Sequence, residues 1–191
     1  MPSANLSGKP SATRPEHVEE DFGLQFPVLD GGICSKGLES TILMHLSQTN
    51  ESSQMNNEWV ILRLGSLPPE AFADIFGYVP RFIQKAEGVH PLCPGQLFRH
   101  YAPRARLILG DVNAQSDAQF ILGFKERSYP RDKRVIILGS LGNPDEVAEN
   151  LYDTLRQLDA EGAAEVWVDT DFPRCGLWQT IAERLFRASI C

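Results

Sequence analysis

The sequence predicts an α/β protein in two parts, residues 1–77 and 105–191, joined by a proline-rich linker at 78–104. The second part is predicted because three apolar, β-rich runs alternate with helical patterns there, as in βαβ units around a mainly parallel sheet. The linker is predicted because prolines and glycines interrupt every longer pattern in that stretch. The three β-rich runs of the second part are 107–109, 134–138 and 165–168.

The two helices of the second part have the clearest patterns in the chain. Asn143 can cap the first of them and Pro144 can open it, while Gly162 follows its end. Apolar residues recur at helical spacing in both, so each helix is expected to bury one face. These stripes consist of Val147, Leu151, Leu155 and Leu158 in the first helix and of Leu177, Ile181, Leu185 and Ala188 in the second. We therefore expect residues 105–191 to fold by themselves, in two or three layers.

The first part is interpreted as a helix followed by short strands. The helix is expected from about residue 14 to 22, with Thr13 as its cap, Glu16 completing a capping box and Gly23 at its end. This order of elements is again that of an α/β unit. The elements expected after the helix are strands at 26–29, 40–46 and 59–62, a polar loop at 50–58 and a short helix at 69–76.

Composition excludes several classes of protein. The 191 residues carry a formal net charge of -7, whereas nucleic-acid coats and membrane-surface proteins need an excess of Lys and Arg to meet phosphate charge. Double-stranded DNA is therefore not an expected partner. No apolar run is long enough to cross a bilayer and the start of the chain has no secretory pattern, so we expect a cytoplasmic protein. The four cysteines form no CxxC pair and are expected to be reduced thiols outside any zinc site.

The linker has a local positive charge. Between residues 81 and 106, five Lys or Arg face a single acid, which gives a net charge of about +4. Such a run is either a solvated surface or an anion-binding one. Within it, Arg99, His100 and Tyr101 bring together a planar cation, a titratable ring and an aromatic hydroxyl, which suit a nucleotide. The alternative is that these side chains are structural.

Two further segments place polar groups on turns. In the loop at 2–11, Ser3, Asn5 and Ser11 could hold a phosphate before the start of a helix, although a frayed polar terminus has the same composition. The turn at 37–42 could present Ser40 to a small polar ligand. Arg63 directly follows an apolar strand, where ligands commonly bind in open α/β sheets. An ordinary turn and a surface ion pair are the alternatives for the last two.

Several motifs, read in order, resemble the threonylcarbamoyl-AMP synthases, and the tail resembles the small C-terminal domain that only the long form of this family carries. The resemblance therefore extends over nearly the whole chain. It implies the C-terminal part of a YrdC-like α/β domain at 1–77, a linker that acts as a lid, and a small Rossmann-like α/β domain at 105–191. The motifs are SANLSGKPS at 3–11, DGG at 30–32, GLESTI at 37–42, ILRLG at 61–65 and PGQLFRHYAP at 94–103.

The resemblance implies an L-threonylcarbamoyladenylate synthase, a nucleotidyltransferase that joins L-threonine, bicarbonate and ATP, with Mg²⁺, into threonylcarbamoyl-AMP and pyrophosphate. That product serves the threonylcarbamoyladenosine modification of tRNA, so partner proteins of tRNA processing are implied as well. No metal-ligating side chain is predicted. The roles implied are ATP binding for Ser3, Asn5, Ser11 and Arg63, threonine binding for Ser40, and lid contacts for Arg99, His100 and Tyr101.

The sequence also departs from the family. It begins at the serine motif, and the Lys-x-Arg pair that precedes this motif in the family is not found, so we expect residues 1–77 to lack strand partners and to be unstable alone. Leu64 stands where the family usually has proline, and CPGQLF replaces the usual SPGMKY. Two alternatives to an enzyme therefore remain: a non-catalytic nucleotide-binding or regulatory module, and an unrelated flavodoxin-like domain. A separately supplied N-terminal half is a possible partner of such a shortened enzyme.

Overall fold

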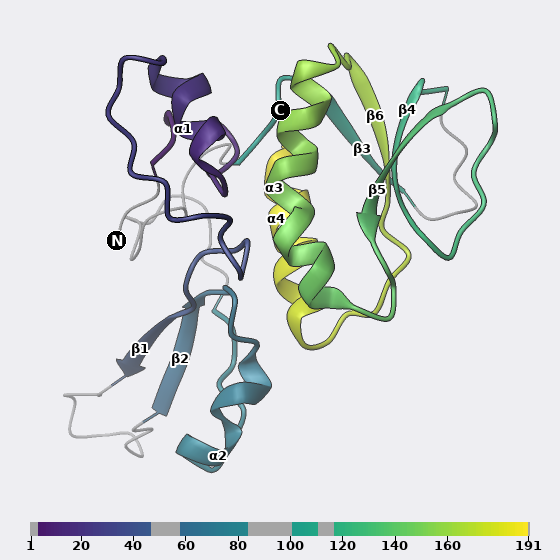
Figure 1. Ribbon diagram of the computed structural model, residues 1–191. Helices are drawn as coiled ribbons and strands as arrows, with labels where there is room; N and C mark the ends of the chain where they lie inside the picture. The colour runs from purple at the N-terminus through teal and green to yellow at the C-terminus, as the bar shows by residue number, and fades with distance from the viewer. Residues whose placement is uncertain (1–3, 47–57, 84–100, 111–116, 191) are drawn as a thin grey trace.

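The computed structural model describes residues 4–46, 58–83, 101–110 and 117–190. It has a mixed α/β fold, as the sequence predicted, with two sheets of different kinds. The smaller sheet belongs to the N-terminal part and the larger one to the C-terminal part (Figure 1). Two helices, α3 (Pro144–Ala160) and α4 (Leu177–Ser189), lie between the larger sheet and the N-terminal part.

The larger sheet has four strands in the order β3-β6-β4-β5, and every neighbouring pair is parallel. Both α3 and α4 cover the same face of this sheet (Figure 1). Of the two arrangements expected from sequence, the one with two layers is therefore the one observed. The strands are β3 (Arg106–Gly110), β4 (Phe120–Phe124), β5 (Arg134–Gly139) and β6 (Glu165–Asp169).

Strand β4 was not predicted, and the helix expected between residues 109 and 134 is absent from the described residues of that stretch. The sequence pattern does not indicate this strand, because the strand is short and contains a glycine, which weakens a strand pattern. In the structure Gly123 is required by close packing, since a Cβ there would lie 2.4 Å from the ring of Tyr129. Tyr129 belongs to the segment at 125–133, which joins β4 to β5 and packs with Trp167 on the face opposite the helices.

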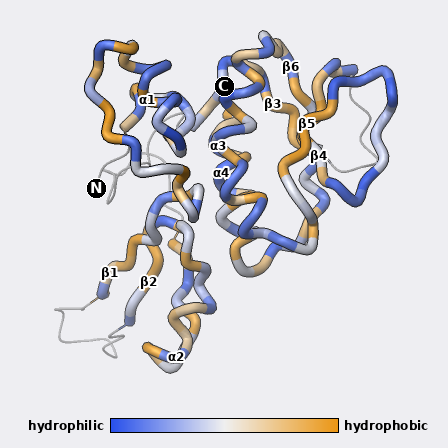
Figure 2. The backbone as a smooth tube through the Cα atoms, in the orientation of Figure 1, coloured by the Kyte–Doolittle hydropathy of each residue, from blue (hydrophilic) through white to orange (hydrophobic). Residues whose placement is uncertain are grey.

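Helices α3 and α4 follow their sequence patterns closely. The Asn143 side chain accepts a hydrogen bond from the Glu146 amide, as a capping residue does. All eight residues of the two predicted stripes are buried. They belong to one core with the strands, to which Leu38 and Tyr101 also contribute from the N-terminal part and the linker. Figure 2 shows the apolar strands that meet these helices.

The N-terminal part begins with α1 (Pro15–Phe22), close to the expected bounds and ended by Gly23. The cap predicted at Thr13 was wrong: the helix is preceded by Arg14, which makes no side-chain cap. The reason is local, because the Thr13 amide donates instead to Nδ1 of the buried His17, at 3.1 Å. The His17 ring accepts at Nδ1 and donates from Nε2 to Asp153, which fits a neutral ring, and burial together with the Arg156 charge lowers its pKa.

The strand predicted at 26–29 was also wrong. These residues have no ladder partner among those described, and Leu29 is 96% exposed. Strands β1 (Ile42–Leu46) and β2 (Glu58–Arg63) were predicted correctly and pair antiparallel. The loop predicted between them lies mostly outside the described residues. The short helix predicted at 69–76 is a 3₁₀ turn, η1 (Pro69–Phe72), that continues into α2 (Ala73–Phe76).

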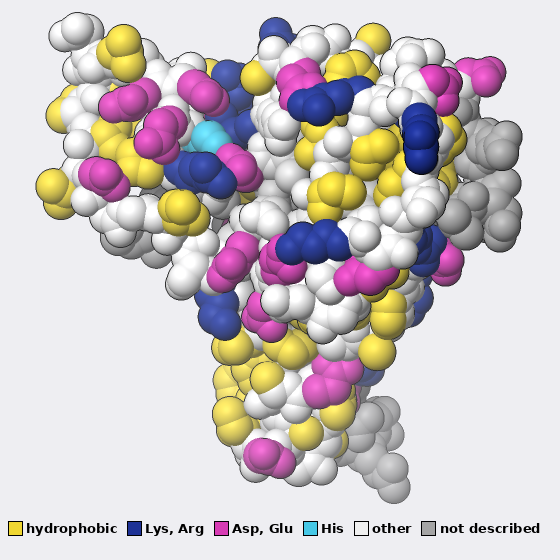
Figure 3. All heavy atoms as spheres, turned by 45° about the vertical axis from the view of Figure 1, so that its right-hand side comes forward, with side chains coloured by type: hydrophobic (Ala, Val, Ile, Leu, Met, Phe, Trp, Pro, Cys, Tyr) yellow, Lys and Arg dark blue, Asp and Glu magenta, His cyan; other side chains and the backbone are white. Residues whose placement is uncertain are grey.

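Strand β2 is paired on both edges, because the Ile61 amide donates to the Arg81 carbonyl and the Ile83 amide donates to the Ile61 carbonyl, each at 2.9 Å. Large apolar side chains are nevertheless exposed over the N-terminal part, and hydrophobic groups gather on the lobe formed by β1, β2 and α2 (Figure 3). Exposed apolar patches of this kind are typical of interaction surfaces. The most exposed large apolar side chains of the whole N-terminal part are Leu24, Leu29, Ile33 and Ile75.

Candidate functional site

The segment at 37–41 enters β1 and is held on two sides by backbone. A Cβ at Gly37 would lie 2.2 Å from the Ala148 carbonyl oxygen on α3, and one at Gly65 would lie 2.3 Å from the backbone of Ser40 and Thr41. Such contacts leave room for glycine only. The Ser66 amide donates to the Glu39 carbonyl at 2.8 Å, which ties the segment to the chain that leaves β2. The backbone around Ser40 is therefore closely fixed.

Two of the residues singled out from the sequence meet here. Arg63, at the end of β2, donates to the Ser40 carbonyl from Nε at 3.2 Å and from Nη2 at 2.8 Å. Its Nη2 also lies 3.3 Å from the Ser40 hydroxyl. Ser40 is exposed and Arg63 is partly exposed. The pair thus presents a hydroxyl and a planar cation side by side to solvent, a combination that can bind a polar, anionic ligand.

The residue before Ser40, Glu39, has a largely buried carboxylate with three side-chain partners. It accepts hydrogen bonds from the Ser11 hydroxyl at 2.7 Å, from the Tyr152 hydroxyl at 3.0 Å and from Nε of Arg184 at 3.1 Å. Burial acts to raise the pKa of Glu39, but the Arg184 charge and these hydrogen bonds outweigh it and leave the pKa below its usual value. Ser11, predicted to contact a nucleotide, is buried here with its hydroxyl directed to Glu39.

Tyr101 of the linker closes one side of the cluster. Its ring lies 5.4 Å from that of Tyr152, centroid to centroid, and the Arg184 guanidinium carbon lies 5.2 Å from its ring centre. Its backbone φ of 64° is in the left-handed region, which a bulky residue adopts only where its surroundings hold it. Burial and the nearby Glu39 charge raise the pKa of Tyr101, so its hydroxyl stays protonated at neutral pH.

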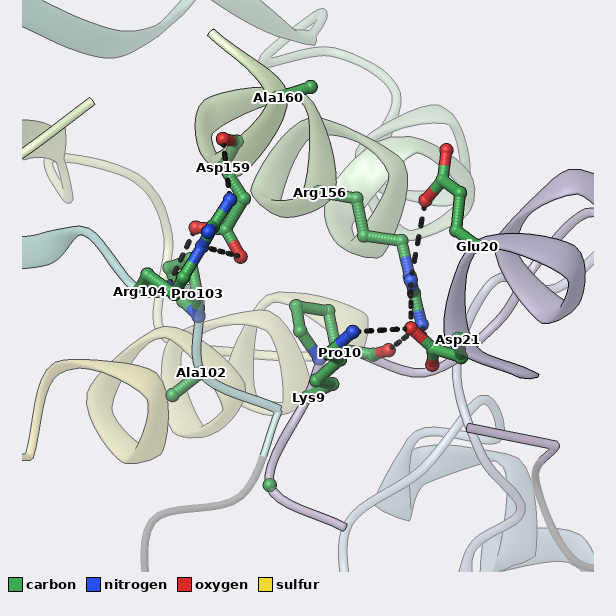
Figure 4. Close-up of a pocket in the computed structure, with 11 residues that line it drawn as sticks. Lys9, Pro10, Glu20, Asp21, Ala102, Pro103, Arg104, Arg156, Asp159 and Ala160 are labelled. Atoms are coloured by element: carbon green, nitrogen blue, oxygen red, sulfur yellow. Dashed lines mark hydrogen bonds and ion pairs between the residues drawn. The ribbon is translucent and has the colours of Figure 1, made fainter. Parts of the chain in front are cut away.

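The loop that carries Asn5 is fixed by a second buried carboxylate. Asp21 accepts from the Leu6 amide at 3.2 Å, from Lys9 at 2.9 Å and from both terminal nitrogens of Arg156, at 3.1 and 2.8 Å. We call Asp21 with its partners Lys9 and Arg156 the Asp21 latch. Figure 4 shows the latch on one wall of a cavity of about 540 Å³, with the Arg104–Asp159 pair on the other wall. The Asn5 amide donates to the Leu6 and Lys9 carbonyls, whereas its Oδ1 is the sole buried side-chain acceptor without a hydrogen bond in the described part of the chain.

Protonation of Asp21 is expected to release this latch at acid pH. Burial acts to raise the pKa of its carboxyl, but hydrogen bonds from Arg156, Lys9 and Leu6 outweigh it and lower the pKa from 3.8 to about 2. Because the folded pKa is the lower one, Asp21 stabilises the folded chain above about pH 4, and this contribution is lost as the pH falls toward about 2. Urea unfolding of the parent chain and of Asp21→Asn measures it. The difference in unfolding free energy should be constant near neutral pH and shrink below about pH 4; a difference independent of pH would contradict the assignment.

The remaining predicted residues Ser3, Arg99 and His100 lie outside the described residues. Within the described ranges, no group of three or more His, Cys, Asp or Glu side chains could hold a metal ion. The same ranges contain no helix long and apolar enough to span a membrane.

Sequence reasoning missed the three residues that connect the site to the C-terminal part: Glu39, Tyr152 and Arg184. Tyr152 and Arg184 are next to apolar-stripe residues on α3 and α4 and are buried with them. An arginine beside such a stripe could have indicated a buried ion pair, because a buried arginine needs an anionic partner. Nothing in the sequence pattern indicated that this partner is Glu39, which is 145 positions away.

The fold and this site define a class of protein: an α/β protein in which the helices of a parallel-sheet part pack against a preceding part that carries an adjacent serine and arginine. The family model described as "Threonylcarbamoyl-AMP synthase, C-terminal domain" matches residues 66–189, and the one described as "Telomere recombination" matches residues 1–65. The chain therefore belongs to the threonylcarbamoyl-AMP synthase family, as the sequence motifs indicated.

Individual relatives agree with this assignment. The chain is 34% identical over 209 residues to the threonylcarbamoyl-AMP synthase of Pyrococcus abyssi and 30% identical to that of Bacillus subtilis, covering 98% of this chain and 56% of each relative. The crystal structure of P. abyssi Sua5 complexed with L-threonine superposes with a TM-score of 0.75 at 30% identity, covering 98% of this chain and 56% of that one. The chain thus spans about half the length of the relatives that it matches.

Proposed function

We propose that this chain takes part in L-threonylcarbamoyladenylate synthesis, in which L-threonine, bicarbonate and ATP yield threonylcarbamoyl-AMP, pyrophosphate and water for tRNA modification. The observation that carries the proposal is the Ser40–Arg63 pair, a hydroxyl and a guanidinium fixed side by side at the end of β2. Membership of the family supports it, as does the likeness to a relative whose crystals hold L-threonine.

In this proposal each residue has a chemical role. The Ser40 hydroxyl binds L-threonine, while Arg63 neutralises phosphate charge as the threonine carbamate attacks the α-phosphate. Magnesium enters as the MgATP complex and offsets the charge of the phosphates. The unpartnered Oδ1 of Asn5 fits this use, because a neutral oxygen is a ligand that Mg²⁺ accepts. Tyr101 and its linker neighbours act as the lid that keeps water from the reacting groups.

Kinetics of pyrophosphate release test the proposal. The assay uses ATP, L-threonine and bicarbonate, with mass detection of threonylcarbamoyl-AMP. It is run on the chain alone and on the chain mixed with a polypeptide for the portion of the P. abyssi relative that it does not cover. We expect product at least in the mixture, because exposed side chains such as Leu29 and Ile75 offer the added polypeptide an apolar surface to bind. ATP binding without product in both reactions would instead support the regulatory module.

Replacement of the two site residues should reduce this activity. Arg63→Gln removes a charged donor from the developing phosphate charge, and we expect kcat/KM to fall about 100-fold or more. Ser40→Ala should mainly raise the KM for L-threonine, because it removes a hydroxyl that binds this substrate. The matched control is Arg81→Gln, which removes an exposed arginine that pairs with Glu58 beside the same strand. Equal kinetic constants for Arg63→Gln and Arg81→Gln would overturn the proposed role of Arg63.

A further inference from the structure

We propose that Arg184 of α4 is a positioning residue for the substrate site. Through Arg184, the C-terminal domain holds the Ser40–Arg63 pair and the linker residue Tyr101 in place. The proposal rests on the proposed function for its substrate, L-threonine. No hydrogen bond or ion pair joins Arg184 to Ser40 or Arg63, and Arg184 is 1% exposed. Its influence is therefore indirect, through the residues that it holds.

The contacts of Arg184 converge on the chain neighbours of the site residues. Nε donates to the Glu39 carboxylate at 3.1 Å, and Glu39 directly precedes Ser40. Nη2 donates to the Leu64 carbonyl at 2.7 Å, and Leu64 directly follows Arg63. Because Arg63 in turn donates to the Ser40 carbonyl, these contacts form a closed ring around the site. The guanidinium spans the ring from the side of the C-terminal domain.

The same guanidinium also reaches the lid and a second helix. Its carbon lies 5.2 Å from the centre of the Tyr101 ring, within the range of a cation–π contact. Nη1 is paired with Glu183, which holds the head group from the α4 side. Tyr152 of α3 supports the arrangement, since its hydroxyl donates to the Glu39 oxygen that also accepts from Arg184. One planar cation thus holds the two sides of the substrate pair and the linker ring at once.

Packing alone does not account for an arginine at this position. Burial of a charge is costly, and apolar residues of similar volume often replace buried ion pairs without loss of stability. What only the guanidinium offers is a rigid fork whose donors point in fixed directions to separate acceptors. The three donors of a lysine ammonium sit on one nitrogen, so lysine can neutralise Glu39 but lacks the spread fork that reaches Glu39, the Leu64 carbonyl and the Tyr101 face together.

The test compares Arg184→Met and Arg184→Lys with the control Arg187→Met in the full chain. Arg187 lies three residues further along α4 and pairs with the other carboxylate oxygen of Glu183, so its loss affects this shared ion pair but none of the contacts of Arg184 with Glu39, Leu64 and Tyr101. A milder variant is Tyr152→Phe, which keeps the ring and removes only the hydroxyl bonded to Glu39. NMR follows the ring signals of the four ¹³C-labelled tyrosines, assigned by Tyr→Phe substitution, and the amide signals of Ser40 and Leu64.

We expect both Arg184 variants to shift the Tyr101, Ser40 and Leu64 signals, with Tyr152→Phe shifting the Ser40 signal and Arg187→Met leaving all three in place. In the pyrophosphate assay, kcat/KM for L-threonine should fall about 100-fold in Arg184→Met without rescue by lysine, as expected for a misplaced site. Unmoved signals in Tyr152→Phe and in a folded Arg184 variant would overturn the positioning role. If the parent chain neither binds L-threonine nor forms product, the proposed function fails, while the NMR comparison still decides the role of Arg184.

Discussion

Replacement of Gly37 by alanine is expected to separate the segment at 37–41 from α3 and to reduce the stability of the chain strongly. The new Cβ would lie 2.2 Å from the Ala148 carbonyl oxygen and 2.4 Å from the Glu149 Cα. Both are backbone atoms of a long helix, so neither can move aside without disturbing α3. The left-handed backbone at this position, with φ of 63°, adds about 1–2 kcal/mol for any residue with a Cβ. The total loss should therefore exceed this backbone contribution.

Gly162→Ala is the matched control, because Gly162 has nearly the same φ, 70°, with no atom near the position of a Cβ. Its loss of unfolding free energy should be limited to the backbone contribution of about 1–2 kcal/mol. Urea unfolding followed by circular dichroism measures both variants. Equal losses in the two variants would mean that the close approach of Gly37 to α3 has no energetic weight.

Asp169→Ala is expected to have the second large effect, a loss of about 3 kcal/mol or more in unfolding free energy, because it removes the buried carboxylate shared by Arg127 and Tyr129 and leaves Arg127 with only the exposed Asp171 as an ion-pair partner. The Asp169 carboxylate lies at the end of β6 and has no exposed surface. It accepts from Nη1 of Arg127 at 3.0 and 3.1 Å and from the Tyr129 hydroxyl at 2.8 Å. Arg127 and Tyr129 both belong to the segment that joins β4 to β5, so its attachment to the sheet should loosen.

The control within the same cluster is Asp171→Ala. Asp171 also pairs with Arg127, at 2.9 Å, but its side chain is 54% exposed. Exposed ion pairs contribute at most about 1 kcal/mol, so this variant should unfold at nearly the urea concentration of the parent chain. A comparable loss in both variants would show that burial does not decide the strength of this cluster.

The elements that the sequence predicted well are those whose stability is decided locally. Helix α3 has a capping asparagine, a proline at its first position and an apolar stripe, which agree with one another and with the structure. The strand wrongly expected at 26–29 has an apolar pattern but no ladder partner among the described residues, and a strand exists only where another strand pairs with it. Strand β4 is the converse case, since a glycine that weakens the pattern is required by the ring of Tyr129.

The candidate site was predictable in part for a similar reason. Ser40 and Arg63 belong to motifs that resemble the family, and the structure brings them together. Their support was not predictable, because Glu39, Tyr152 and Arg184 come from three segments far apart in the chain. Their contacts depend on how α3 and α4 meet the N-terminal part. No local pattern encodes that arrangement, and only the three-dimensional structure reveals it.

Helix α3 has protein on nearly every side, which limits how the chain can be divided. Leu151 and Leu155 face the sheet, whereas Tyr152 and Arg156 face the N-terminal part, where they bind Glu39 and Asp21. A fragment cut at residue 105 would therefore gain an apolar and cationic surface that is buried in the whole chain. Such a fragment could keep its fold and still be poorly soluble. A designer who wants the small domain alone would first need to make the outer side of α3 polar.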